Sequence, residues 1–289
     1  MNAPNDTYVI SRRDLQRRFD RAAGTFDDAD FVHAHTRDSL LQRLEPVVVD
    51  ARTVVDLGCA TGQASRALSS RYRGAHLISV DLSRQMLRAH KRPRWFAKRS
   101  FVQADATALP FADHSVDVVF CNLMLPFVGN PDGVFAEVSR ILSEGGVFAF
   151  ATLGPDSLLQ LRRAWQQADA GEHTFRFADM HDIGDGLVRA GLADPVLDVD
   201  RLTVSYASAA GLFADLTATG ARNSLAGRNN TLCGKDRFRR MSTALEEHKT
   251  GDRFELGFEL VYAHCWGRGE PATASEYRVD AGKIGLRRG

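Results

Sequence analysis

A glycine turn follows the first apolar strand that the sequence predicts. The strand ends at Leu57, and the turn runs Gly58-Cys59-Ala60-Thr61-Gly62. Because glycine has no Cβ, such a turn lets a ligand come close to the backbone and to the N–H groups that open the next helix. A dinucleotide pyrophosphate requires G-x-G-x-x-G here, and Ala60 and Gln63 occupy the second and third glycine positions. The sequence of the turn therefore argues against a dinucleotide-binding site.

An acidic residue ends the second predicted strand. Asp81 lies about twenty residues beyond the glycine turn, where a carboxylate can accept two hydrogen bonds from ribose hydroxyls. The alternative is a helix N-cap, since both Asp81 and Ser83 precede a helix. Asp105 follows the third strand and Asn122 the fourth. Together with the glycine turn, these residues favour ribose binding by Asp81.

The elements that position these residues alternate between strand and helix. Strands are predicted at 47–57, 76–80, 101–103, 116–121 and 147–152, and helices at 63–73, 83–91 and 131–142. This alternation predicts a parallel, doubly wound sheet. The strands are continuous apolar runs, which fits a sheet covered by helices on both faces.

Further elements flank this core. Residues 11–45 predict two helices divided near Gly24, and Pro46 ends them. After the core we predict helices at 156–169 and 179–190, a strand at 196–206, two helices within 209–249 and a strand at 254–266. The expected organisation is a helical cap (1–46), a main domain (47–267) with insertions at about 155–180 and 207–250, and a polar tail (268–289).

The core resembles the class I S-adenosylmethionine-dependent methyltransferases over residues 53–152. Their first motif, D-x-G-x-G-x-G, is matched by Asp56, Gly58 and Gly62, with Ala60 at the middle glycine. The stretches 105–111, 115–119 and 137–146 also resemble the family's pattern in order and spacing. The resemblance implies a Rossmann-like α/β fold with a seven-stranded, mostly parallel sheet, N-terminal helices and a C-terminal helical lid insertion.

The same resemblance implies S-adenosylmethionine as the cofactor. In that family an acid at the position of Asp105 contacts the adenine amino group, and the residues after the fourth strand lie near the reactive methyl group. The cofactor-binding residues that the resemblance implies are Asp56, Gly58, Ala60, Gly62, Asp81, Leu82, Met86, Asp105, Ala106, Asn122 and Leu123.

Outside the core the chain resembles the malonyl-acyl-carrier-protein O-methyltransferases of biotin synthesis. The matching stretches are 19–26, 153, 157–158, 164–165, 173–177, 220–221 and 227–228. The resemblance implies His173 and Arg176, in an H-x-x-R-F stretch, as catalytic residues, and Phe26 and Phe127 as substrate-binding ones. The family often has Tyr at the position of Phe26 and Trp at that of Phe127, so this chain keeps the rings but lacks the phenol hydrogen bond.

The implied acceptor is the free carboxylate of a malonyl group on acyl carrier protein. A carboxylic acid titrates near pH 4, so this acceptor is already ionised and needs no general base. It needs a cation to hold it and a position in line with the methyl group. Attack of an anion on a sulfonium removes charge, so a site shielded from water favours the transition state. A lid carrying His173 and Arg176 would meet these demands.

Two other functions stay open. The stretches 182–184, 189–191 and 220–223 also resemble an arginine hydroxylase that assembles respiratory complex I, whose acceptor is a protein side chain. The His173-x-x-Arg176 pair argues against it, and no iron or other metal site is predicted, since His33 and His35 point apart on a helix. The third function is methylation of an isoprenoid quinone or another small carbon acid.

The composition limits the classes of binding partner that we expect. Lys plus Arg total 37 and Asp plus Glu total 36, a net charge of +1, which predicts no general attraction to nucleic acid or to an acidic membrane. No apolar stretch approaches the ~20 residues that span a bilayer, and the N-terminus lacks a signal-peptide pattern. The four cysteines form no CxxC pair, so we expect reduced thiols and a cytoplasmic protein.

An acidic carrier protein would need a local basic surface. Arg13, Arg17 and Arg21 share one helix face at four-residue spacing. A second cluster contains Lys235, Arg239 and Arg240. Each can equally be an ordinary solvated helix face, and the sequence predicts no oligomeric state.

Overall fold

The computed structural model describes residues 9–90, 98–228, 234–247 and 249–268. Most of the predicted polar tail and Cys233 lie outside these described residues.

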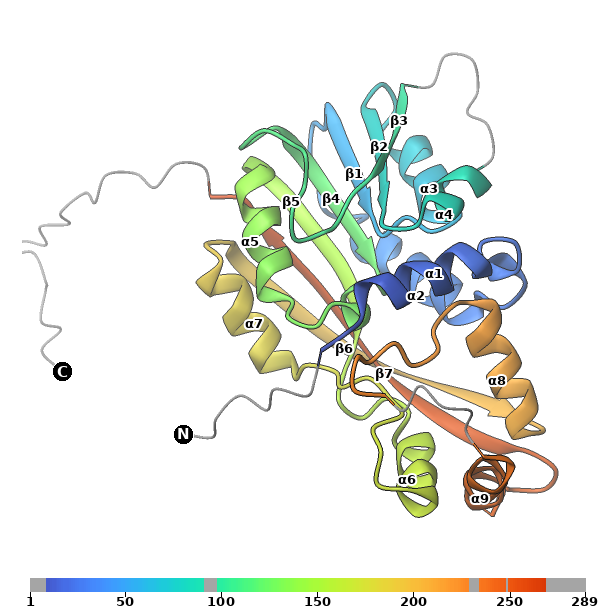
Figure 1. The fold of residues 1–289 in the computed structure, drawn as a ribbon. Coiled ribbons are helices and arrows are strands. Elements are labelled where there is room, and N and C mark those ends of the chain that lie inside the picture. The colour runs from blue at the N-terminus through green and yellow to red at the C-terminus, as the bar shows by residue number, and fades with distance from the viewer. Residues whose placement is uncertain (1–8, 91–97, 229–233, 248, 269–289) are drawn as a thin grey trace, which may run out of the picture.

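A single seven-stranded sheet forms the centre of the molecule (Figure 1). Its strands are β1 (Thr53–Leu57), β2 (His76–Asp81), β3 (Arg99–Gln103), β4 (Val116–Asn122), β5 (Leu142–Leu153), β6 (Ala193–Tyr206) and β7 (Phe254–Trp266). The strand order is β3-β2-β1-β4-β5-β7-β6. The pairs among β1 to β5 are parallel, whereas β7 runs antiparallel to both β5 and β6. This sheet confirms the predicted fold class.

Helices cover both faces of the sheet. Successive side chains of a strand point to opposite faces, so Val55 packs on one side of the sheet and Val54 on the other. The first side is covered by α5 (Asp132–Ile141) and α7 (Met180–Arg189), and the second by α2 (Phe31–Arg43) and α3 (Gln63–Arg71). This double burial explains why the central strands are apolar at almost every position.

The N-terminal helix lies across the end of the sheet. This helix, α1 (Arg12–Ala22), is capped by Ser11 and contacts α4 (Arg84–Ala89). A short 3-10 helix (Phe26–Asp28) joins α1 to α2. Residues 9–11 also pair with residues 224–226, which ties the start of the described chain to a segment far along the sequence.

Three further helices gather at the far ends of β6 and β7 (Figure 1). They are α6 (Leu159–Ala168), α8 (Ala209–Ala218) and α9 (Lys235–Glu246). Trp165, Leu212 and Met241 pack together in their shared apolar cluster. The first predicted insertion therefore contains α6, and the second contains α8 and α9.

Several element boundaries differ from the prediction: for example, β5 was predicted from residue 147 but begins at Leu142. The run 47–57 was predicted as one strand, but β1 begins only at Thr53. Val47 and Val49 pack half-buried against the core, whereas Val48 is 90 % exposed. Val47 and Val49 therefore serve packing rather than a ladder. The helix predicted from residue 156 begins at Leu159, because Glu259 holds the preceding backbone through the N–H of Asp156.

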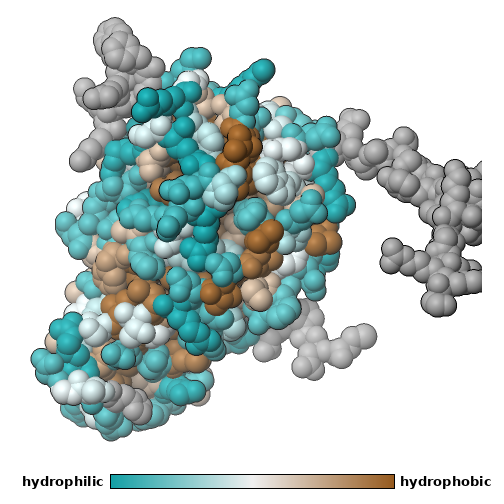
Figure 2. Space-filling view, turned by 180° about the vertical axis from the view of Figure 1, so that it is seen from behind, coloured by the Kyte–Doolittle hydropathy of each residue, from teal (hydrophilic) through white to brown (hydrophobic). Residues whose placement is uncertain are grey.

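The surface is mixed in hydropathy on the face that Figure 2 shows. Figure 2 shows hydrophobic residues in separate patches among hydrophilic ones on the face seen from behind Figure 1. Among the helices of the described residues, none has the length and apolar content that crossing a membrane requires.

Candidate active site

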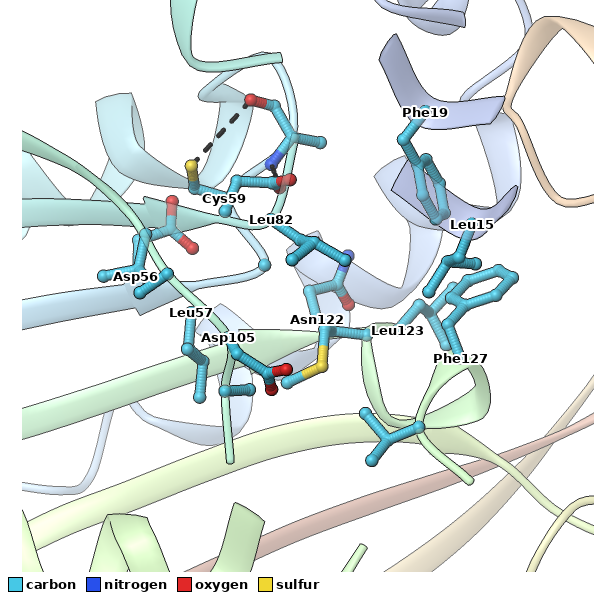
Figure 3. A pocket seen from close by; sticks show the side chains of 18 of the residues that line it. Leu15, Phe19, Asp56, Leu57, Cys59, Leu82, Asp105, Asn122, Leu123 and Phe127 are labelled. Atoms are coloured by element: carbon cyan, nitrogen blue, oxygen red, sulfur yellow. Dashed lines mark hydrogen bonds between the residues drawn. The ribbon is translucent and has the colours of Figure 1, made fainter. Parts of the chain in front are cut away.

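A pocket of about 450 Å³ lies where β1, β2 and β4 end. We call it the first pocket. Its walls are the glycine turn, the residues after β2, β3 and β4, and side chains from α1 and α2. Figure 3 shows Asp56 and Asp105 on one side of it and Leu15, Phe19 and Phe127 on the other, with Asn122 between them.

The glycine turn has the left-handed backbone that its sequence suggests. Gly58 has φ +73°, and a Cβ there would lie 2.6 Å from the side chain of Met124. Gly62 has φ +84°, is the N-cap residue before α3 and packs against the ring of His90 rather than lining the pocket. Ala60, at the middle glycine of the motif, also has a positive φ of 45°, a strained conformation for a residue with a Cβ.

Asp81 is held by the turn and lines the pocket. Its Oδ2 accepts the N–H of Ala60 at 2.9 Å, and its Oδ1 accepts the N–H of Ser83 at 2.7 Å. Ser83, not Asp81, caps α4, since its Oγ accepts the N–H of Met86 at 3.1 Å. Burial raises the pKa of Asp81 to about 6, against the two backbone hydrogen bonds that lower it. The capping alternative for Asp81 is therefore wrong.

Asp56 lies at the floor of the pocket, only 1 % exposed. Its Oδ2 accepts a hydrogen bond from Ser65 Oγ at 2.5 Å, and Ser65 Oγ also lies 2.8 Å from Ser79 Oγ. Burial raises the pKa of Asp56 to about 7, and the Ser65 hydrogen bond opposes that shift. Two acidic side chains with raised pKa values thus flank the glycine turn.

Asn122 offers an open hydrogen-bond acceptor. Its Nδ2 donates to the carbonyl oxygen of His33 at 3.0 Å. Its Oδ1 is buried and has no hydrogen-bond partner among the described residues. A buried acceptor without a partner is costly, so this oxygen indicates a ligand donor in the first pocket. The next residue, Leu123, lines the pocket and has φ 53°.

Unlike Oδ1 of Asn122, both carboxylate oxygens of Asp105 already have partners. Its Oδ1 accepts both the N–H and the hydroxyl of Thr107 at 2.8 Å, and its Oδ2 pairs with Arg12 of α1. Asp105, Ala106 and Arg12 all line the first pocket.

The first pocket collects most of the predicted binding residues. Those that line it are Asp56, Gly58, Ala60, Asp81, Leu82, Asp105, Ala106, Asn122, Leu123, Phe26 and Phe127. Met86 does not line it: the side chain is fully buried and packs beneath Phe26 and Ala60. Met86 and Gly62 therefore support the pocket wall from behind.

A second pocket, of about 550 Å³, lies between α6, α8 and the loops 169–177 and 221–228. His173 lines it, stacks on Trp165 with ring centroids 3.8 Å apart, and bonds to Asp169 through Nε2 at 2.6 Å. Arg176 pairs with Glu172. Neither His173 nor Arg176 lines the first pocket.

The helices α1 and α2 contribute lining residues that the motifs did not reveal. Leu15 and Phe19 come from α1, and His33 and Arg37 come from α2. Each pair is spaced by four residues, the one signal that pointed to a shared helix face. Burial, and to a smaller extent the charge of Arg37, lowers the pKa of His33 to about 4. His33 is thus neutral at the edge of the pocket.

Comparison with known proteins shows which family and which solved structures this fold resembles. Residues 55–150 match a family described as a methyltransferase domain. The fold is similar to the YcgJ protein of Bacillus subtilis, with TM-score 0.57 and 16% identity over 81% of this chain and 99% of that chain. It is also similar to phosphoethanolamine N-methyltransferase 2 of Haemonchus contortus, with TM-score 0.54 and 16% identity over 90% of this chain and 60% of that chain. These structures support the fold alone.

Closer relatives match almost the whole chain. The malonyl-[acyl-carrier protein] O-methyltransferase of Halorhodospira halophila is 39% identical over 292 residues, which cover 99% of both chains. The enzyme of the same name from a Methylovorus species is 38% identical over 268 residues, which cover 90% of both chains. The matches extend beyond residues 55–150 into the helices that form the second pocket. The chain therefore belongs to the malonyl-[acyl-carrier protein] O-methyltransferase family.

Proposed function

We propose that this enzyme transfers the methyl group of S-adenosylmethionine to the free carboxylate of a malonyl group on acyl carrier protein, a step of biotin synthesis. The observation that carries the proposal is the first pocket, with Asp81 and the open Asn122 oxygen at the glycine turn. The identity of the acceptor is supported by the names of the relatives that match this chain over almost its full length.

The residues of the first pocket fit the methyl donor. Asp81, facing the pocket beside the turn, suits the two ribose hydroxyls, which donate to a carboxylate. Oδ1 of Asn122, for which the described part of the chain supplies no hydrogen-bond partner, suits an ammonium donor such as the α-amino group. Leu82 and Ala106 provide apolar contacts for a purine. The donor, when bound, supplies an electrophilic methyl group on a sulfonium.

The other side of the first pocket fits the acceptor. Leu15, Phe19 and Phe127 form an apolar wall there. A carboxylate that reaches this wall loses water, and its attack on the sulfonium cancels charge, so an apolar wall favours the transition state. The reaction needs no base, which agrees with the neutral state of His33 at this edge. Phe26 and Phe127 thus contribute the shape of their rings to the acceptor site, without the hydrogen bond that a phenol would donate.

His173 and Arg176 act on the acceptor from the lid in this proposal. Phe175, between them in the sequence, contacts Phe127 of the first pocket with ring centroids 5.4 Å apart. The H-x-x-R-F stretch therefore touches the acceptor wall through one ring, while His173 is anchored on Trp165 and Asp169. Arg176→Ala is expected to lower turnover of a free-carboxyl acceptor and to leave donor affinity unchanged.

The carrier protein itself would meet a basic surface. Arg13, Arg17 and Arg21 are exposed on α1, and Lys235, Arg239 and Arg240 are exposed on α9. Steering by these side chains is compatible with a net charge of +1, because it depends on local potential. The described cysteines, Cys59, Cys121 and Cys265, are free, in keeping with the cytoplasmic location that we propose.

Methyl transfer can be tested directly. The enzyme is incubated with S-adenosylmethionine and malonyl-acyl carrier protein, and the product is weighed by mass spectrometry. We expect the malonyl group to gain one methyl group. Acetyl-acyl carrier protein, which lacks a free carboxylate, is the matched control and should stay unmodified. Modification of the acetyl form, or of neither form, would contradict the proposal.

A further inference from the structure

The second pocket shares a wall with the first. Phe127 lines the first pocket and contacts Phe19 and Phe175 edge-on, with ring centroids 5.1 and 5.4 Å away. Phe175 lines the second pocket. The helix α1 joins the two pockets as well, since Phe19 faces the first and Arg18 faces the second. A chain-like molecule in the second pocket would therefore end at the ring that borders the donor site.

The lining of the second pocket combines aromatic and basic side chains. Its rings are Trp165, His173, Phe175, Phe177 and Phe213. Of the described residues that line it, four are arginines (Arg18, Arg222, Arg228 and Arg237) and two are acids (Asp169 and Glu172). The pocket thus combines an apolar surface with an excess of positive charge.

Most of the charged groups already have partners. Arg228 pairs with Asp14 at 2.7 Å, and Arg237 lies 3.7 Å from Asp169. The guanidinium of Arg222 lies over the ring of Phe213, 5.0 Å from its centroid. These three arginines are held in place by side chains of the protein.

Arg18 differs from the other three. Its Nε is buried and has no hydrogen-bond partner within the part of the chain that the structure describes. Burial, followed by the charges of Arg228 and Arg222, lowers the pKa of Arg18, and the charge of Asp14 opposes this shift only in part. A guanidinium kept partly buried beside two like charges is stabilised by an anion that completes the cluster.

We propose that the second pocket binds the phosphopantetheine arm of the acceptor, with the phosphodiester at Arg18 and the pantetheine chain along the aromatic wall towards Phe127. This inference rests on the proposed function, which requires a thioester arm that reaches the first pocket. A phosphodiester carries one negative charge and two non-bridging oxygens, which a guanidinium can contact in a fork. The amide-containing chain suits a wall of rings with polar side chains at its edge.

Binding of the arm alone tests the site without relying on catalysis. Phosphopantetheine and pantetheine, which differ only in the phosphate, are titrated into the full-length enzyme by calorimetry. We expect phosphopantetheine to bind at least tenfold more tightly. Arg18→Gln should remove this difference and leave the affinity for pantetheine within about twofold. Arg163→Gln, on the exposed side of α6, is the matched control and should retain it.

The kinetics of methyl transfer to malonyl thioesters provide a second, independent test of the arm site. Arg18→Gln is expected to raise the KM of malonyl-phosphopantetheine about tenfold, with little change for malonyl-pantetheine. Arg18→Lys should restore part of the difference, because it keeps the charge but loses the fork. Should Arg18→Gln fail to fold, as judged by its thermal midpoint and donor affinity, the comparison of Arg18→Lys with the unmodified enzyme decides the question.

The outcomes separate the two proposals. Equal binding of phosphopantetheine and pantetheine by the unmodified enzyme overturns the arm site, even where malonyl thioesters are methylated. Methylation of no malonyl thioester overturns the proposed function, even where the phosphate is recognised. Coenzyme A carries the same arm, so Arg18→Gln should raise the KM of malonyl-coenzyme A and of the carrier-bound substrate by the same factor. A change with one of them alone would mean that Arg18 contacts the nucleotide or the carrier instead.

Discussion

The first and second pockets meet at Phe127, but they draw on the chain in different ways. The floor of the first pocket comes from residues at the ends of β1, β2 and β4 or directly after them, so each lies within a few positions of a strand end. The second pocket needs α1, the segment 158–177, the segment 213–228 and Arg237 of α9 at once. One pocket is fixed by strand register, and the other by how remote segments pack.

This difference predicts different responses to substitution. Strands of a parallel sheet are buried on both faces and resist local movement, so a change at a strand end should alter only the ligand contact. A pocket made of loops and short helices has fewer buried contacts to hold it. Changes there should alter geometry as well as contact, and should affect the acceptor rather than the donor.

The largest effect is expected at the strand-end acid. Asp81→Ala should weaken S-adenosylmethionine binding by about 1–3 kcal/mol, roughly 5- to 150-fold, because the ribose hydroxyls lose their acceptor. Calorimetry measures the affinity. Asp185→Ala, on the exposed side of α7, is the control and should bind normally. Unchanged affinity in a folded Asp81→Ala enzyme would remove the ribose assignment.

A smaller effect is expected in the lid. His173→Ala removes the hydrogen bond to Asp169 and the stack on Trp165, so we expect about a tenfold loss of catalytic efficiency with malonyl thioesters. Donor affinity should change less than about twofold, since His173 does not line the first pocket. His181→Ala is matched, because His181 also bonds to an aspartate but is 86% exposed. A donor defect in His173→Ala would contradict the separation of the two pockets.

The pH dependence of the first pocket should be smaller still. The pKa values of Asp81 and Asp56, about 6 and about 7, lie above the value of 3.8 expected for an unfolded aspartate. The ligand-free folded state therefore binds more protons than the unfolded state between about pH 4 and pH 7, and its free energy of unfolding falls as the pH rises through this range.

Donor affinity should change in the opposite direction. Ribose hydroxyls donate to an ionised Asp81, so affinity is expected to rise about fourfold from about pH 5.5 to about pH 8. Calorimetry across this range, paired with thermal midpoints of the ligand-free enzyme, checks both trends. Asp81→Asn should flatten the affinity profile. A pH-independent affinity in the unmodified enzyme would show that Asp81 stays ionised throughout.

The smallest effect concerns the surface beyond both pockets. Catalytic efficiency with malonyl-acyl carrier protein should decline more steeply with salt than that with malonyl-pantetheine, by about two- to threefold between 0.1 and 1 M, as the Debye length shrinks from about 10 to about 3 Å. Reversing charge at Arg239 and Arg240, or at Arg13 and Arg17, should flatten the slope for the carrier substrate. Equal slopes for the two substrates would exclude steering by either cluster.

The sequence by itself determined the parallel strands of the sheet and the strand-end residues of the first pocket. The order of apolar runs and glycine turns predicted parallel strands, and Asp56, Gly58, Asp81 and Asn122 took their places because each is adjacent to a strand end. Local patterns also predicted α5 and α7 to within one or two residues. These features depend on contacts between near neighbours in the sequence, which periodicity and turn residues report directly.

Only the tertiary structure decided how the remaining residues meet. It assigned the cap of α4 to Ser83, brought Leu15 and His33 to the first pocket, and put His173 in the second. It also placed Arg18 beside Arg228, more than two hundred positions away, because residues 9–11 pair with residues 224–226. Such contacts arise from the packing of segments that share no local pattern, so no spacing in the sequence could show them.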